Sequence, residues 1–436
     1  MFQIEEKSPP QIQPVIQRHA DDAAFYWSQR DAHRASPLMP YARFVQFDRL
    51  LQAHLDGVML AGECAWDMAW KNLQRWRGAG ECFVAGMLLL HTAMDAAQKR
   101  SRFDALCAML RQDDDLLRGM ASAIAWQGNA CLQWLPQWLS AQAEPILNAL
   151  ALHACALLRA PAPDLMPWFD HDAPQVRAAA ARCAGVSLAR QWQWQLQALA
   201  RDEDANVRMQ AIKARLLHLQ TPNATHDAAL LDLAQQELLA CNQSAQGKGL
   251  RAVQAADAAQ QLAGMLGQVL APGSAQLGSL SRAIPLRQFC YLLACHGDPA
   301  NLPWLVQACA HQESARAAGA ALHMISGIDL ERAGWSAAAP SEDDSMAADR
   351  ARPLADPDAG LPWPDVAAVQ SGLPHMQAAL AGQAAVLCGM PKQDPEAMRQ
   401  VLQQGRMAAR QVAAWSLLRT GAAYYPRLAS SSVQAG

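Results

Sequence analysis

Aliphatic residues recur in the middle of the chain with a period of about thirty residues. The anchors of this pattern are Leu117, Ile146, Val176 and Val207, which lie 29, 30 and 31 residues apart. An acidic residue or a proline precedes each anchor, and both residue types favour the first turn of a helix. Alanine and other apolar residues then follow at helical spacing. The pattern predicts a repeated unit of two helices joined by a short turn.

More divergent copies of the unit are predicted at Leu250–Arg251, Leu286–Arg287 and Ala315–Arg316. One such unit buries mainly alanine methyl groups, each worth only about 0.8 kcal/mol, which does not offset the entropy lost on ordering. Neighbouring units must therefore stack. We expect an all-α fold, a HEAT-like α-solenoid of stacked helix pairs in which one helix of each pair lines a concave surface.

Composition agrees with a folded helical chain. Of the 436 residues, 52% are hydrophobic, 6% aromatic and 17% charged, with a net charge of −3. Alanine, leucine and glutamine are abundant and β-branched residues few, which favours helix over strand. The mean hydropathy of −0.07 and the lack of a long apolar run argue against a membrane span. The eleven cysteines are scattered singly, as free thiols in a reducing compartment would be, so we expect a cytoplasmic protein.

Four segments are expected along the chain. Residues 1–78 lie outside the period and predict an N-terminal helical cap, and residues 79–335 hold the repeat array. Residues 336–365 form an acidic, proline-rich loop with seven acidic residues against two arginines. We interpret this loop as a solvated, mobile insertion; the alternative is a docking site for a basic partner surface. Residues 366–436 predict a C-terminal helical pair and tail.

Motifs that carry catalysis or cofactors are not apparent. Gln246-Gly-Lys-Gly249 resembles a phosphate-binding loop but lacks the hydroxyl residue that such a loop needs. Cys290, Cys295 and His296 lie in an apolar helical run without a fourth ligand at useful spacing, so we interpret them as core residues. The runs of aspartate stand at helix starts, where capping accounts for them. We therefore expect no catalytic residue, metal or cofactor, and a protein that is not an enzyme.

Tryptophan and arginine are the residues best suited to hold a partner protein, because both dominate binding hot spots. The chain has fourteen tryptophans against eight phenylalanines and five tyrosines, and most should fill gaps between alanine-rich helices. The candidate partner-binding residues are Trp134, Trp138, Arg177, Trp192, Trp194 and Arg208. A competing interpretation, which we favour for the arginines, is a ladder of ion pairs between units formed by Arg118, Arg177, Arg208, Arg251, Arg287 and Arg316.

The stretch from Asp202 to Ala211 resembles the HEAT pattern, in which aspartates lie five and three residues before an aliphatic-arginine pair. At Val176–Arg177 the two aspartates lie one place earlier, which argues against an Asp–Arg ladder there. The whole chain resembles a bacterial family of uncharacterised HEAT-like proteins encoded near type VI secretion genes. The fragments that carry this resemblance are Ala53–Gly57, Gly297–Leu305, Met324–Leu330, Leu361–Asp365 and Leu402–Arg410.

This resemblance implies a non-enzymatic scaffold or adaptor that binds an effector or a spike-associated protein of type VI secretion. An immunity protein that neutralises a neighbouring toxin by direct binding is the alternative. A HEAT-like nucleic-acid-binding protein or enzyme fits less well, since the chain outside the acidic loop is only slightly basic and a DNA reader needs a basic stripe. The expected partner is thus another protein, neither nucleic acid nor membrane.

Overall fold

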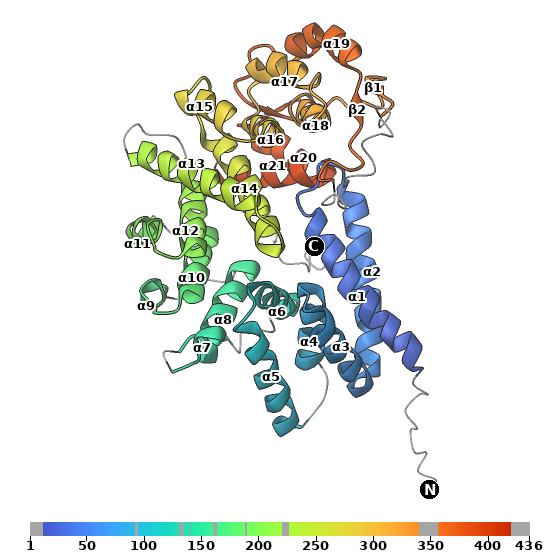
Figure 1. Cartoon of the computed structure of the whole chain (residues 1–436), viewed down its shortest axis with the longest axis vertical. Coiled ribbons are helices and arrows are strands. Elements are labelled where there is room, and N and C mark those ends of the chain that lie inside the picture. The colour runs from blue at the N-terminus through green and yellow to red at the C-terminus, as the bar shows by residue number, and fades with distance from the viewer. Residues whose placement is uncertain are drawn as a thin grey trace.

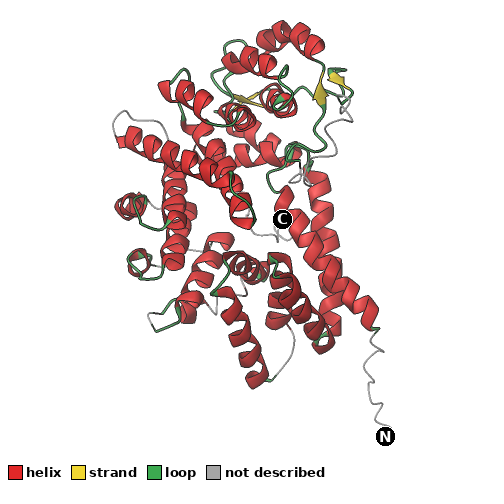
Figure 2. Cartoon of the chain, viewed as in Figure 1, coloured by secondary structure: helices red, strands yellow, loops and turns green. Residues whose placement is uncertain are grey.

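Helices account for nearly all of the regular structure (Figure 2), as the all-α prediction required. The computed structural model describes residues 12–91, 95–128, 130, 135–140, 142–159, 164–187, 190–219, 226–339 and 356–419. None of the helices in these ranges is both long and apolar enough to cross a membrane.

The elements follow one another along the chain as labelled in Figure 1. The first are α1 Gln13–His33, α2 Tyr41–Ala61, α3 Glu63–Trp76, α4 Ala79–His91, α5 Ala96–Leu110, α6 Asp114–Trp126 and α7 Leu135–Trp138. Next come α8 Pro145–Leu158, α9 Met166–Phe169, α10 Pro174–Ser187, α11 Gln193–Leu199, α12 Ala205–His218, α13 His226–Ala245 and α14 Leu250–Val269. The last helices are α15 Ala275–Ala283, α16 Leu286–His296, α17 Leu302–Ala308, α18 Ala315–Ser326, α19 Val366–Ala379, α20 Pro395–Gln404 and α21 Met407–Arg419.

Each predicted anchor lies in the first turn of a helix. The anchors Leu117, Ile146, Val176 and Val207 begin α6, α8, α10 and α12, and all four are buried. Pro145 and Pro174 are the first residues of their helices, and the Asp204 carboxylate accepts hydrogen bonds from two backbone N–H groups of α12. The divergent copies begin α14, α16 and α18. The period located four of these helix starts, and the divergent residue–arginine pairs located three more.

The helices that carry the anchors pack against one another in chain order. Contacts run from α4 through α6, α8, α10 and α12, and then through α14 and α16 to α18. The helices α5, α9 and α11 lie against members of this series, on the outer side of the molecule (Figure 1). Small side chains allow this close approach, since most of the buried residues of α10 are alanines.

The last helix closes the array on the first helix pair. The first N–H groups of any helix lack partners within it. In α21 the amides of Met407 and Ala408 donate to the carbonyl oxygens of Met39 and Ser36, at 2.9 and 3.1 Å. Ser36 and Met39 belong to the loop between α1 and α2, so segments nearly four hundred residues apart in the sequence lie side by side (Figure 1).

Two arginines of this region strengthen the closure. The Arg406 guanidinium donates to the Asp329 carboxylate at 2.7 Å and to the Pro37 carbonyl at 3.3 Å. The Arg410 guanidinium is buried and lies 3.5 Å from the centre of the Tyr41 ring. At the other end of α21, Arg419 donates to the carbonyl oxygens of Leu219 and Gln268, at the ends of α12 and α14.

The described residues contain four two-residue strands that the sequence did not predict. They form two antiparallel pairs, β1 Ser336–Ala337 with β2 Trp363–Pro364, and β3 Val386–Leu387 with β4 Met390–Pro391. The second pair and α19 lie in the segment where only a helical pair was expected. Strands of two residues are too short to show an alternating hydrophobic pattern, so the sequence does not predict them.

The β3–β4 hairpin covers the ends of two helices. Val386 N–H donates to the carbonyl of Gly297, which follows α16, and Cys388 N–H donates to Met324 near the end of α18. Gly297 has φ +77°, and a Cβ there would lie 2.2 Å from the Val386 carbonyl oxygen. Only glycine fits both the left-handed backbone and this close contact. The Lys392 ammonium caps α16 as well, by donating to the carbonyls of Cys295 and His296.

The described end of the acidic loop differs from the solvated insertion that we expected. Asp358 is buried and pairs with Arg287 at 2.8 Å, while Asp356 pairs with Arg316 at 2.7 Å. The arginines in the first turns of α16 and α18 thus hold this end of the loop against the helices. Residues 340–355, which hold much of the loop's charge, lie outside the described residues.

Replacing Arg406 tests the closure. Arg406→Ala removes the hydrogen bonds to Asp329 and Pro37 and leaves the half-buried carboxylate without its cation, so we expect the free energy of unfolding to fall by about 1–3 kcal/mol. Arg399→Ala on neighbouring α20 is the matched control, because Arg399 pairs only with exposed Glu396; its expected change is below about 0.5 kcal/mol. Chemical denaturation measures both. Equal losses in the two variants would contradict the closure.

Candidate functional site

Arg177, a candidate from the sequence, ties its repeat unit to the next one. Its guanidinium makes two hydrogen bonds to the Asp202 carboxylate, at 2.8 and 2.9 Å, and two more to the carbonyl oxygens of His171 and Asp172. The early position of the aspartates before Val176 is therefore no obstacle, because the carboxylate comes from the following unit. The arginine uses the backbone, not the side chains, of the turn that precedes its own helix.

Arg208 repeats this arrangement one unit later. It donates to Glu237 of α13 at 3.2 Å and to the carbonyl oxygens of Asp202 and Glu203, both at 2.9 Å. The ladder of ion pairs between units that we favoured is thus present at Arg177 and Arg208. Both guanidiniums donate hydrogen bonds to acceptors of the chain itself. A role of these two arginines in binding a partner stays a prediction.

The ladder has a clear electrostatic signature. The hydrogen bond with Asp202 raises the pKa of Arg177 above its ordinary value. Burial acts to raise the pKa of Asp202, but the hydrogen bonds from Arg177 and from the Asp204 N–H outweigh it, so the pKa of this carboxyl falls below its ordinary range. The ionised pair is therefore the stable form at neutral pH.

The other arginines of the period find different partners. Arg118 of α6 pairs with Asp115 on its own helix and with Asp31 of α1, whereas Arg287 and Arg316 hold the acidic loop. Arg251 lies exposed at the start of α14. The same sequence signal thus leads to three kinds of contact, because the acidic partner depends on which segment the fold brings near.

The candidate tryptophans separate into packed and exposed residues. Trp138 is half-buried and stacks on Phe103 at 5.6 Å between ring centres, and Trp192 is only 8% exposed beside Phe169. These two fit the expectation that most tryptophans fill the core. Trp134 lies outside the described residues. Trp194, in contrast, is 77% exposed on α11.

A second exposed apolar residue lies on the neighbouring short helix α9. Met166 of α9 is 45% exposed, and its Sδ atom accepts a hydrogen bond from Gln195, the residue that follows Trp194. The helices α9 and α11 are neighbours on the outer edge of the array (Figure 1). We call Met166 and Trp194 the α9–α11 patch. An exposed indole beside a flexible thioether is the kind of surface that anchors a partner protein.

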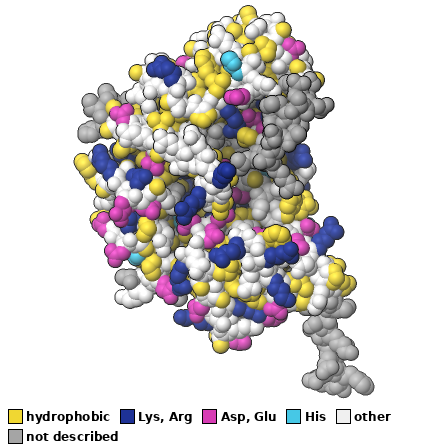
Figure 3. All heavy atoms as spheres, viewed as in Figure 1, with side chains coloured by type: hydrophobic (Ala, Val, Ile, Leu, Met, Phe, Trp, Pro, Cys, Tyr) yellow, Lys and Arg dark blue, Asp and Glu magenta, His cyan; other side chains and the backbone are white. Residues whose placement is uncertain are grey.

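Charged side chains from several helices meet in the middle of the molecule. Lys213 of α12 donates to Gln261 of α14 at 2.9 Å. Loss of hydration, together with the nearby charges of Arg34 and Arg182, lowers the pKa of Lys213 to about 8, and Asp257 acts in the opposite direction. Figure 3 shows basic and acidic side chains mixed over the middle of this face, so the centre has no single sign of charge.

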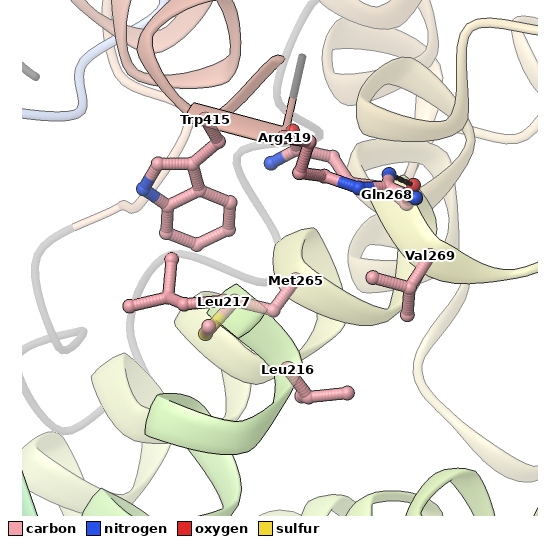
Figure 4. Close-up of a pocket in the computed structure, with 7 residues that line it drawn as sticks. All are labelled: Leu216, Leu217, Met265, Gln268, Val269, Trp415 and Arg419. Atoms are coloured by element: carbon pink, nitrogen blue, oxygen red, sulfur yellow. Dashed lines mark hydrogen bonds between the residues drawn. The ribbon is translucent and has the colours of Figure 1, made fainter. Parts of the chain in front are cut away.

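Two hollows lie where the last helices meet the rest. The first is lined by Leu216, Leu217, Met265, Gln268, Val269, Trp415 and Arg419 (Figure 4). In this hollow the Trp415 ring of α21 faces the aliphatic side chains of α12 and α14. It is a packing gap beside the Arg419 contacts, and its small, mainly apolar walls offer little to hold a ligand.

The second hollow lies at the closure itself. Its polar lining is His323, Asp329, Glu331 and Arg406, with Leu38 from the loop after α1. Burial first, and then Arg406, lower the pKa of His323, whose Nδ1 lies 2.9 Å from the Ile328 carbonyl oxygen. His323 is therefore neutral at physiological pH.

Three of the fragments singled out in the sequence come together at this second hollow. Residues 324–330, 361–365 and 402–410 each contribute to its lining. The sequence alone did not predict that these fragments meet, because nothing within one fragment indicates its contacts with the others. The structure thus assigns them a shared architectural position at the closure.

Within the described residues, neither a complete set of metal ligands nor a reactive thiol is present. No group of three or more His, Cys, Asp or Glu within those ranges has metal-binding geometry as it stands. Burial raises the pKa of the Cys290 thiol to about 12 and that of Cys295 to about 11, so both remain protonated core residues, as expected. Comparison with known proteins finds no similar family model, curated protein or solved structure.

A double-mutant cycle tests the ladder. Arg177→Ala, Asp202→Ala and the double variant should reveal a coupling energy of about 1–2 kcal/mol, because the pair is bidentate and largely shielded from water. The exposed pair Arg100–Asp104 serves as control, with an expected coupling below about 0.5 kcal/mol. Urea denaturation provides all four stabilities of each cycle. A coupling no larger than the control's would refute the ladder.

The same pair predicts a pH dependence. Because the pKa of Asp202 is lower in the folded chain than in the unfolded chain, its contribution is fully present well above pH 4 and is lost as the pH falls toward the lower folded value. We therefore expect the stability difference between wild type and Asp202→Asn to shrink between about pH 5 and pH 3. A difference that grows over this range would contradict the assignment.

Proposed function

We propose that this chain is a non-enzymatic scaffold that binds another protein. The helix pairs are interpreted as a HEAT-like α-solenoid, with α1–α3 as its N-terminal cap and α21 joining that cap to the far end. The observation that carries the proposal is the α9–α11 patch. Its large apolar side chains are exposed on a framework that packs most of its aromatic rings, and such exposure marks interaction surfaces.

The construction of the framework supports this role. The ladder at Arg177 and Arg208 fixes the orientation of successive units, so the α9–α11 patch is presented by rigid elements. A preorganised surface loses little side-chain entropy on binding.

The resemblance to the family encoded near type VI secretion genes motivates the choice of partner. We propose an effector or a spike-associated protein of that system, held by the α9–α11 patch. The same patch could equally cover a toxin, which is the immunity role. The two roles differ in what co-purifies: an adaptor retains secretion components when the neighbouring toxin gene is deleted, whereas an immunity protein retains nothing.

Trp194 is the residue to test. Trp194→Ala should weaken binding to the purified cognate effector or spike protein at least tenfold, since a central tryptophan typically contributes about 2 kcal/mol or more. Trp76→Ala is the matched control, because Trp76 is also well exposed, at 61%, but lies on α3; it should change affinity less than twofold. Isothermal titration calorimetry measures both. Equal affinities for wild type and Trp194→Ala would refute the proposed surface.

A further inference from the structure

Two histidines face each other across the first helix pair. The Nδ1 atoms of His19 on α1 and His54 on α2 are 3.1 Å apart, and the ring centres are 5.2 Å apart. At this separation one nitrogen donates the hydrogen bond and the other accepts it. The Asp22 carboxylate lies 3.8 Å from the same His54 nitrogen. Two imidazoles and a carboxylate therefore share one small region of surface.

The two rings are positioned by their surroundings. His54 stacks on Tyr26, with ring centres 5.4 Å apart and an angle of 25° between the planes. A Cβ at Gly57 would lie 2.9 Å from the His19 ring, so the missing side chain is what lets the ring lie against α2. Glycine within a helix costs roughly 0.5–1 kcal/mol relative to alanine. The sequence fragment Ala53–Gly57 thus supplies one ring and makes room for the other.

The distance between the two nitrogens that allows this hydrogen bond also allows both to bind one metal ion. Imidazole nitrogens bind zinc at about 2.0–2.1 Å, which places two adjacent ligand nitrogens about 3.0–3.4 Å apart. The observed 3.1 Å falls in this range without movement of either ring. His19 and Asp22 are three residues apart on α1 and so project from the same face of the helix.

The third ligand needs one adjustment. As the side chains stand, Asp22 pairs with Arg18 at 3.4 Å, which is why no complete three-ligand group is present. The Arg18 side chain is 82% exposed, so this ion pair is weak and its release costs little. Rotation of the carboxylate toward His54 then completes the set, and water can fill the remaining position because the site is at the surface.

We propose that His19, His54 and Asp22 form a surface site for a divalent transition-metal ion, zinc being the first candidate. The bound ion would join α1 to α2, the helices whose connecting loop receives the first turn of α21. The site lies on different helices from the α9–α11 patch, and the proposal does not depend on the proposed function.

The test is zinc binding by the full-length, chelator-treated chain in competition with a chromophoric chelator at pH 7.5. Wild type should bind one zinc ion at the proposed site, apart from any zinc bound elsewhere by wild type and variants alike. His19→Ala and His54→Ala should each weaken binding at the proposed site at least tenfold. His54→Gln serves if His54→Ala folds poorly. His375→Ala is the matched control, an exposed histidine on α19 whose loss should leave affinity unchanged.

Gly57→Ala supplies a second readout. It keeps every ligand and favours the helix, yet it displaces the His19 ring, so zinc affinity should fall while the melting temperature without metal holds or rises. Zinc should also raise the melting temperature of wild type but not that of His54→Gln. The absence of zinc binding by wild type, or equal affinities in wild type, His19→Ala and His54→Gln, would overturn the proposal.

Discussion

The closed arrangement depends on the first N–H groups of α21, which have no acceptor within their own helix. A helix leaves its first amides without partners, and here Ser36 and Met39 supply the acceptors. At the ends of α12 and α14 the last carbonyl oxygens lack donors within their own helices. Arg419 donates hydrogen bonds to one carbonyl oxygen at each of these two ends. One helix thus satisfies the backbone of three distant segments and holds the ends of the array together.

Between the two ends, stability comes from many similar local contacts. The units bury alanine and a few aliphatic anchors. In the units of Arg177 and Arg208, the arginine of the second helix also pairs with an acidic residue farther along the chain, as Arg177 does with Asp202. Where the array ends, the same arginine position holds the acidic loop, as Arg287 does with Asp358. A single sequence device therefore serves both for stacking the units and for docking the loop. The α9–α11 patch is presented by this framework.

The sequence predicted what depends on neighbouring residues. Anchors such as Val176 and Val207 located helix starts, because an aliphatic residue after a capping residue is a local signal. The contacts that close the array were not predictable, since nothing near Arg406 in the sequence indicates Asp329 or Pro37 as its partner. The exposure of a side chain was equally unpredictable from the sequence: Trp192 and Trp194 are two residues apart, yet Trp192 packs beside Phe169 and Trp194 is exposed.

Hydrogen exchange at the amides of Met407 and Ala408 tests the closure most directly, because it requires no substitution and reports on the two bonds that define it. If α21 donates these protons to Met39 and Ser36, both amides should exchange about as slowly as those in the interior of α21. Exchange at the rate of a solvent-exposed helix start, while the interior of α21 stays protected, would show that the array is open at this point.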